Sequence, residues 1–236
     1  MQNEKLTSER QIVLDTETTG LDPGQGHRII EIGCVEMINR RLTGNNYHQY
    51  LKPDREIDEG AQAVHGISNE FLADKPRFPD VVKDFIDYLD GAELIIHNAP
   101  FDVGFIDHEF KRAGDEFGKV ATYCTVIDTL VMARKLRPGK KNNLDILCKE
   151  YEVNNKHREL HGALLDSELL AEVYLRMTGG QSTLSLDSEE SSGAADGIAA
   201  IKKLSADRKP IKIIQANDEE LEAHQAIIGK MEAELW

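Results

Sequence analysis

The sequence predicts an α/β fold, in which a mixed sheet of five strands is flanked by helices. The first third of the chain carries apolar runs separated by turn residues. From residue 79 onward, short apolar runs alternate with amphipathic helical stretches. Strands that come first and then alternate with helices are typical of a mixed sheet with helices on its faces.

The first strands are expected to form an antiparallel meander. Apolar runs predict strands at 11–15, 29–38 and 47–52. Gly44, Asn45 and Asn46, between the second and third runs, are turn residues.

The later elements follow from apolar periodicity and from helix-end signals. A helix is predicted over 79–89, because proline suits the first turn and Gly91 follows the end. The remaining predictions are a strand at 94–97, a helix at 101–112, a strand near 122–127, helices near 128–136 and 144–151, and a helix from about 163 to 177.

Composition bounds the class of protein. The 236 residues, 40% apolar and 30% charged, suit one main domain with an appendage. No stretch approaches the roughly 18 apolar residues of a membrane span, and the polar first ten residues lack a signal-peptide core. The three cysteines, Cys34, Cys124 and Cys148, fit neither a disulfide framework nor a zinc ribbon. A cytoplasmic, reducing location without membrane association is therefore expected.

The net charge of −14 argues against a non-specific nucleic-acid coat. It leaves room for an enzyme whose metals and few local cations meet phosphates. A basic cluster surrounds Pro138 and Gly139, and the sequence allows either a solvated loop or a phosphate-contacting one. Its members are Arg134, Lys135, Arg137, Lys140 and Lys141.

The chain changes character after Gly180. Residues 181–200 are rich in Ser, Gly, Ala and acids, which is typical of a linker. Residues 210–216 form a short β-like run, and Asp218 is expected to cap a charged terminal helix. The predicted organisation is a domain at 1–180, a linker at 181–200 and a flexible tail at 201–236.

Two carboxylates, Asp15 and Glu17, follow the first apolar run. Side chains at i and i+2 of a strand share a face, so the two acids converge. Like charges held beside a core need a counter-charge, for which a divalent metal is the usual solution. Turn acids after a strand are the alternative.

Two more acids are expected to point inward from distant segments. Asp102 shares a helix face with apolar residues three and four positions on, and Asp166 precedes a similar apolar face. Each alone would suit a helix-capping acid. Gly162 is expected to let the chain turn and to place His161 near Asp166.

Three segments carry a family resemblance. Asp-Thr-Glu-Thr-Thr-Gly at 15–20, His-Asn-Ala-Pro-Phe-Asp at 97–102 and His-x4-Asp at 161–166 resemble, in this order, the three motifs of the DEDDh 3′–5′ exonucleases. Within that family the chain is similar to the proofreading epsilon subunits of bacterial DNA polymerase III, densely over about residues 10–181. The additional matching segments are 28–33, 40–46, 50–53, 64–67, 138–140, 160–166 and 171–175.

The resemblance implies a ribonuclease H-like fold and a two-metal 3′–5′ exodeoxyribonuclease that proofreads for the replicative polymerase. It would release mispaired 3′-terminal nucleotides as 5′-monophosphates. Two Mg²⁺ or Mn²⁺ ions are implied. Asp15 would bridge them, Glu17 and Asp166 would complete one site and Asp102 would serve the other. His161 would be the general base, with an ordinary pKa of about 6.5 near working pH.

The resemblance also implies substrate contacts. Thr16 and Thr18 would lie against the terminal nucleotide, and His65 would line its pocket. Many relatives carry a glutamate that touches the terminal sugar, but Gly60 stands at that position here. Glu59, its neighbour, is the expected substitute.

Partners are implied for the tail. Residues 181–186 resemble peptides that dock on bacterial sliding clamps, with Gln181 as the polar hook and Leu184 and Leu186 as apolar anchors. The segment 201–236 resembles the part of epsilon subunits that binds the polymerase alpha subunit, and some relatives bind a small theta-like subunit. The sequence leaves two alternatives open: an RNA-trimming exoribonuclease of the same fold, and a non-catalytic adaptor between clamp and polymerase.

Overall fold

The computed structural model describes residues 10–156, 158, 160–179, 220–221 and 224–225. The chain divides into two units, Met1–Leu184 and Ser185–Trp236. In the second unit the four described residues are helical and exposed, and they lie within the helix expected after Asp218. Across all the described residues, no helix has the length and apolar character needed to cross a membrane.

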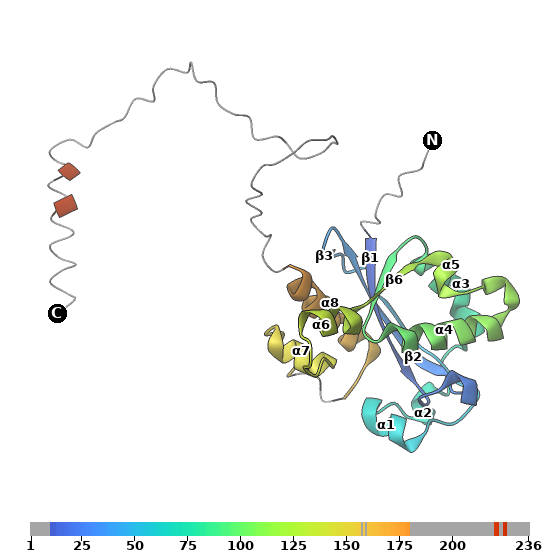
Figure 1. The fold of residues 1–236 in the computed structure, drawn as a ribbon. Helices are drawn as coiled ribbons and strands as arrows, with labels where there is room; N and C mark the ends of the chain where they lie inside the picture. The colour runs from blue at the N-terminus through green and yellow to red at the C-terminus, as the bar shows by residue number, and fades with distance from the viewer. Residues whose placement is uncertain (1–9, 157, 159, 180–219, 222–223, 226–236) are drawn as a thin grey trace, which may run out of the picture. The chain divides into compact units, whose positions relative to one another are not determined.

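The first unit is built on a mixed sheet of six strands in the order β3-β2-β1-β5-β6, with β4 also paired to β2 (Figure 1). β1 runs antiparallel to β2 and parallel to β5, and β5 runs parallel to β6. The predicted meander and mixed sheet are therefore confirmed. The strands are β1 Arg10–Thr18, β2 Ile29–Ile38, β3 Arg41–Leu42, β4 Tyr47–Tyr50, β5 Glu93–Ile96 and β6 Thr125–Asp128.

Helices cover both faces of the sheet, as Figure 1 shows. One face carries α3 Phe78–Leu89, α4 Ala99–Ala113 and α5 Val120–Tyr123. The other carries α6 Thr129–Leu136, α7 Leu144–Glu150 and α8 Ala163–Thr178. Four short elements complete the unit: α1 Glu59–His65, α2 Asn69–Leu72, and 3-10 turns at Pro23–Gln25 and Asp115–Phe117.

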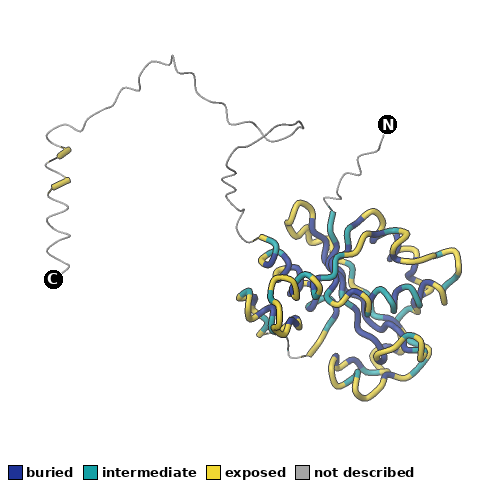
Figure 2. The backbone as a smooth tube through the Cα atoms, in the orientation of Figure 1, coloured by how far each residue is buried: buried dark blue, intermediate teal, exposed yellow. Residues whose placement is uncertain are grey.

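Strand β1 divides the core into two layers. Ile12 and Leu14 pack with Phe85 and Phe105 of the α3–α4 layer, whereas Val13 packs with the α6–α8 layer. This alternation is the two-residue period of a strand that is buried on both faces. In Figure 2 the central strands are correspondingly buried, while the outer helical turns are exposed.

Two predicted strands differ from the structure in their bounds, and one strand was not predicted. β1 does not end at Asp15 but runs to Thr18, because its pairing with β2 continues to Ile29. The strand expected near 122–127 begins only at Thr125, since residues 120–123 form the helix α5. The sixth strand, β3, follows a turn in which Asn39 and Arg40 adopt positive φ angles.

Gly33 on β2 sets the distance between the sheet and α8. A Cβ atom at this position would lie 2.2 Å from the carbonyl carbon of Ala163. Only glycine therefore allows the first turn of α8 to rest on the strand. Ser167 donates a hydrogen bond to the Gly33 carbonyl (2.9 Å), and Gly33 pairs with Asp15 across the ladder. This contact brings Asp166, the neighbour of Ser167, towards the acids of β1.

We expect Gly33→Ala to lower the free energy of unfolding by about 1–3 kcal/mol, the usual cost of overpacking a core. Gly104→Ala is the matched control, because a Cβ there meets nothing within 4 Å and Gly104 lies inside α4. That control should be neutral or more stable by about 0.5–1 kcal/mol. Urea denaturation of both variants measures the difference, and equal stability of Gly33→Ala and wild type would refute the close-approach argument.

Candidate active site

Strand β1 presents acids on one side and a threonine on the other. Asp15 and Glu17 share the face of Val13, towards α8, while Thr16 faces α4. The Thr16 hydroxyl donates to Oδ1 of Asp102 at 2.7 Å. The strand thus contributes two acids directly and positions a third through a hydrogen bond.

Asp102 and Asp166 are carried by the first turns of α4 and α8, and each is only 3% exposed. Both helices bury the faces that the spacing predicted. Capping was the simpler interpretation of each acid, but Asp102 accepts from Thr16 and both oxygens of Asp166 accept from Arg158. Neither helix has a side-chain cap bond at its N-cap residue.

His161 lies directly before α8, as expected. Its backbone N–H donates to the carbonyl of Val64 (3.1 Å), and its Nδ1 lies 3.5 Å from Oδ2 of Asp166. The expected reason was wrong, however. Gly162 has φ −154°, an extended conformation open to any residue, and a Cβ there would meet nothing within 4 Å. The imidazole is positioned by its backbone hydrogen bond and by α8.

A cavity of about 580 Å³ brings these groups together. Four acids from three segments line it: Asp15, Glu17, Asp102 and Asp166. His161 lines the same cavity, together with Arg158 and Asp145. The residues that the sequence singled out separately therefore surround one space.

The acids repel one another in this space. Burial, followed by the charges of the neighbouring carboxylates, raises the pKa of Asp15 well above its usual value. Burial and the charge of Asp166 raise the pKa of Glu17 to about 8, and burial raises that of Asp102 to about 7. Raised pKa values in a cleft mark negative charge that lacks full compensation.

Arg158 is the cation of the site, and no motif or spacing in the sequence predicts its role. Its Nε and Nη2 bind the two oxygens of Asp166 at 2.5 and 2.7 Å, and its Nη1 binds Asp145 at 2.7 Å. The arginine side chain is only 6% exposed. It stands in a polar loop before α8, where no periodic pattern distinguishes an inward residue from a solvated one.

Arg158 also contacts the imidazole of His161, since its Nη2 lies 3.0 Å from Nδ1. A guanidinium can only donate, so Nδ1 is the acceptor and the neutral ring carries its proton on Nε2. Burial, followed by the charge of Arg158, lowers the pKa of His161. The imidazole is therefore neutral at pH 7, with its Nδ1 lone pair directed at Arg158.

The donor set fits hard divalent cations. Ligand atoms of Glu17, His161 and Asp166 lie within 4.8 Å of one another, whereas Asp15 and Asp102 line the cavity outside this tight group. Carboxylate oxygens are the ligands that Mg²⁺ and Mn²⁺ prefer. Five acids, with Asp145 included, line the cavity beside the single charge of Arg158, so the site has room for further positive charge.

A second cavity of about 490 Å³ adjoins the first through Thr16, Glu17, Leu21 and Phe101. The expected substrate contacts line it: Thr16, Thr18, Gly60 and His65. Glu59 does not, whereas Asp58 does. Of the two acids directly before Gly60 in the sequence, Asp58 therefore lines this cavity and the expected Glu59 does not.

His65 is prepared as a hydrogen-bond donor. Its Nδ1 accepts from the backbone N–H of Ile67 (3.0 Å), which leaves the proton of the neutral ring on Nε2. Burial lowers the pKa of His65, although the backbone of Thr18 favours its protonated form. Within the described residues, this Nε2 is the one buried side-chain nitrogen or oxygen without a direct partner.

Comparison with known proteins identifies the family to which this architecture belongs. A model of the exonuclease family matches residues 12–174. The DNA polymerase III subunit epsilon of Salmonella typhimurium is 54% identical over 221 residues, which cover 92% of this chain and 91% of that protein. The chain belongs to this exonuclease family. Subunit epsilon of Rickettsia felis is 45% identical over 226 residues, covering 96% of this chain and 98% of that protein.

Solved exonucleases share the fold of this family member. Exonuclease X in complex with 5′-overhanging duplex DNA has a TM-score of 0.56 and 28% identity, covering 72% of this chain and 91% of that one. Exonuclease I has a TM-score of 0.62 at 18% identity, covering 73% of this chain and 41% of that one. The predicted ribonuclease H-like fold is thus confirmed. Exonucleases of this family typically use divalent metals.

We expect Arg158→Gln to lower the free energy of unfolding by about 3 kcal/mol in the presence of a chelator, because it leaves the buried Asp166 without its partner. Saturating Mn²⁺ should raise the melting temperature of this variant more than that of wild type, because the ion supplies the missing charge without competition from the guanidinium. Calorimetry with and without Mn²⁺ measures both effects.

Arg112→Gln is the control, since Arg112 pairs with Asp54 and the two side chains are 43% and 45% exposed. It should lose no more than about 1 kcal/mol and respond to Mn²⁺ like wild type. If Arg158→Gln matched this control in both measurements, Arg158 would not be the counter-charge of the acids.

Proposed function

We propose that the protein is a 3′–5′ exodeoxyribonuclease that proofreads for the replicative DNA polymerase. The observation that carries this proposal is the convergence of four acids and a neutral histidine on one cavity. The named relatives, subunits epsilon of DNA polymerase III, support DNA as the substrate and a polymerase complex as the setting. A non-catalytic adaptor would not need this complete set of side chains.

The 490 Å³ cavity is the proposed pocket of the 3′-terminal nucleotide. Its size suits a small ligand. His65 offers a buried Nε2–H without a direct partner, and the hydroxyl of Thr18 is held by the Gly20 carbonyl at 2.6 Å. Asp58 takes the place proposed for the sugar-contacting acid. A nucleotide seated here has its phosphodiester bond beside the carboxylates of the first cavity.

Asp15, Glu17, Asp102 and Asp166 would hold two divalent ions, Mg²⁺ or Mn²⁺, with Asp15 shared between them. When bound, such ions stabilise the charge that develops on the phosphate and acidify a water molecule. Thr16 fixes the rotamer of Asp102 through its 2.7 Å hydrogen bond. Arg158 holds both oxygens of Asp166 and thus orients a carboxylate that the ions also need.

His161 is the proposed general base. Its ring is neutral at pH 7, and its Nδ1 lone pair, which accepts from Arg158 at 3.0 Å, becomes available to water when Arg158 withdraws. The water oxygen attacks phosphorus while Nδ1 takes the water proton, and the bond between phosphorus and the 3′ oxygen breaks. The leaving oxygen gains a proton from solvent. The products are a nucleoside 5′-monophosphate and a strand shortened by one nucleotide.

The proposed partner segments lie outside the described residues. We propose, on the sequence patterns alone, that Gln181, Leu184 and Leu186 bind the sliding clamp and that 201–236 binds the polymerase alpha subunit. A theta-like subunit is a further proposed partner. A tether of this kind raises the local concentration of the exonuclease at the primer end.

The test compares the full chain with Asp15→Asn, which keeps the shape of the side chain and removes its charge. With Mg²⁺, wild type should release mononucleotides from a DNA 3′ end, and faster from a mispaired end because that end frays. The variant should lose at least about a hundredfold in kcat, the scale of losing an electrostatic contact made in the transition state. Full activity in Asp15→Asn would contradict the site, and preference for RNA over DNA of the same sequence would contradict the substrate.

His161→Ala separates the base from the metal ligands in the same assay. It should slow hydrolysis by about 10²–10⁴-fold, the usual contribution of a general base. Its Mn²⁺ titration should stay close to that of wild type. Lost Mn²⁺ binding would show that His161 acts as a ligand rather than as a base alone.

A further inference from the structure

A third cavity, of about 550 Å³, opens beside the catalytic one. The two share His97, Asn98 and Asn143 in their linings, so they are continuous. The residues that line only the third cavity are Leu130, Arg134, Lys140, Lys141 and Asn142. We call this cavity the basic groove.

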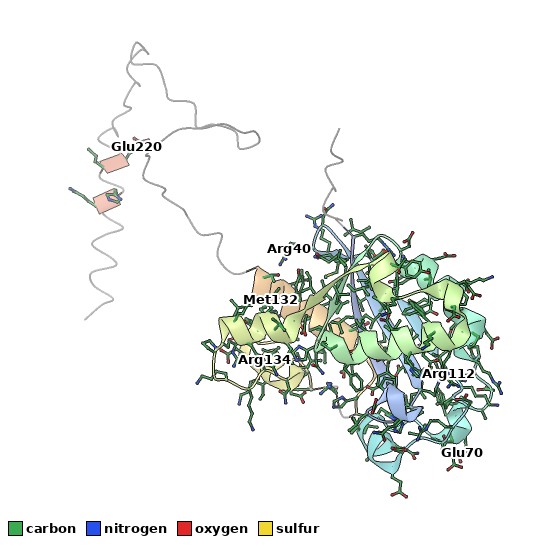
Figure 3. All side chains as sticks on the ribbon, turned by 45° about the vertical axis from the view of Figure 1, so that its right-hand side comes forward. Arg40, Glu70, Arg112, Met132, Arg134 and Glu220 are labelled. Atoms are coloured by element: carbon green, nitrogen blue, oxygen red, sulfur yellow. The ribbon has the colours of Figure 1, made fainter. Side chains whose placement is uncertain are left out.

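The basic groove concentrates unpaired positive charge in an acidic protein. Arg134, Lys140 and Lys141 are exposed, and no described acid lies within ion-pair distance of them. No Asp or Glu lines the groove, although the whole chain has a net charge of −14. Arg134 extends from α6 in Figure 3. Unpaired cations clustered beside a catalytic cavity attract an anionic substrate.

The loop that presents the two lysines is braced from within. Arg137 donates to the side chain of Asn142 (3.0 Å) and pairs with Glu150 (2.8 Å). Asn142 is buried, and its amide donates to the carbonyl of Lys140 at 2.9 Å. The structure thus separates the basic cluster by role: Arg137 holds the loop in place, and Lys140 and Lys141 face the groove.

The three cavities lie in series. The terminal-nucleotide pocket adjoins the catalytic cavity through Thr16, Glu17, Leu21 and Phe101, whereas the groove adjoins it through His97, Asn98 and Asn143. The pocket and the groove share no lining residue. A strand whose last nucleotide fills the pocket, and whose next bond lies at the acids, therefore has the groove available for the nucleotides before that bond.

We propose that the basic groove binds the phosphates of the single strand upstream of the scissile bond. This rests on the proposed function. Arg134, Lys140 and Lys141 each meet one phosphate, and the amides of Asn98 and Asn143 supply neutral hydrogen bonds at the junction. Such contacts read the backbone rather than the bases, which suits an enzyme that must remove any terminal nucleotide.

The experiment uses the full chain carrying R134Q, K140Q and K141Q together. Its control carries K83Q, K111Q and K119Q, three exposed lysines that line none of the three cavities. Both triple variants lose three positive charges. Binding of a fluorescent 12-nucleotide oligo-dT is measured by anisotropy in Ca²⁺ over a range of salt concentrations. Hydrolysis in Mg²⁺ is measured on that oligonucleotide and on the p-nitrophenyl ester of thymidine 5′-monophosphate.

We expect the groove variant to bind the oligonucleotide at least about tenfold more weakly than the control at low salt. Its slope of log affinity against log salt should become shallower by about 2, because each of the three phosphate contacts on a single strand contributes about 0.7. The value of kcat/KM on the oligonucleotide should fall in parallel. Hydrolysis of the ester, which has no upstream phosphate, should stay within about twofold of the control.

The proposal would be overturned if the groove variant bound the oligonucleotide with the same affinity and salt slope as the control. It would also be overturned if oligonucleotide binding were unchanged but binding of fluorescent polyglutamate, measured in the same way, were lost, because that result would assign the groove to an acidic protein. Failure of wild type to hydrolyse either substrate would instead overturn the proposed function, while the anisotropy measurement would still decide the role of the groove.

Discussion

Repulsion among four carboxylates at the end of β1 is the constraint on which the rest of the site depends. Asp15 and Glu17 share one face of a strand that is buried on both sides, and Asp102 and Asp166 approach from helices on opposite faces of the sheet. Burial and the charges of neighbouring acids raise the pKa values of Asp15 and Glu17, and burial raises that of Asp102. A fold that keeps such groups together needs both rigid supports and a counter-charge.

The rigid supports of the acids are direct contacts between neighbouring backbone and side-chain atoms. Gly33 allows α8 to rest directly on β2, and the hydroxyl of Ser167 fastens the contact. Thr16, on the face of β1 that meets α4, holds Asp102 by a hydrogen bond. The counter-charge is Arg158, which binds both oxygens of Asp166 and the lone pair of His161. These atoms are also the ones that the proposed chemistry requires, so Arg158 and a metal ion compete for the same carboxylate.

Much of this arrangement was predictable because it follows from periodicity and local motifs. The spacing of Asp15 and Glu17, and the apolar faces behind Asp102 and Asp166, indicated inward acids without any structure. The meander and the helices on both faces followed from the order of apolar runs. A family resemblance then assigned roles to these residues, including His65, which lines the second cavity and has a buried Nε2.

The features of the site that the sequence did not predict depend on contacts between segments far apart in the chain. Nothing local marks Arg158 as buried, because its partners come from α7 and α8. Gly33 is required because its backbone contacts the start of α8, 130 residues later in the chain. Gly162, which was expected to be needed for a turn, is in an ordinary extended conformation. The strand expected near 122–127 started later because Val120–Tyr123 completes a helical turn first. The sequence also could not separate Arg137 from Lys140 within one basic cluster.

The central claim is that the acids hold two metal ions with Asp15 shared between them. Anomalous diffraction from crystals of the full chain soaked in Mn²⁺ tests it directly. We predict two manganese peaks in the catalytic cavity, with carboxylate oxygens of Asp15 in contact with both and Arg158 moved away from at least one oxygen of Asp166. A single peak without Asp15 among its ligands, or none, would contradict the account.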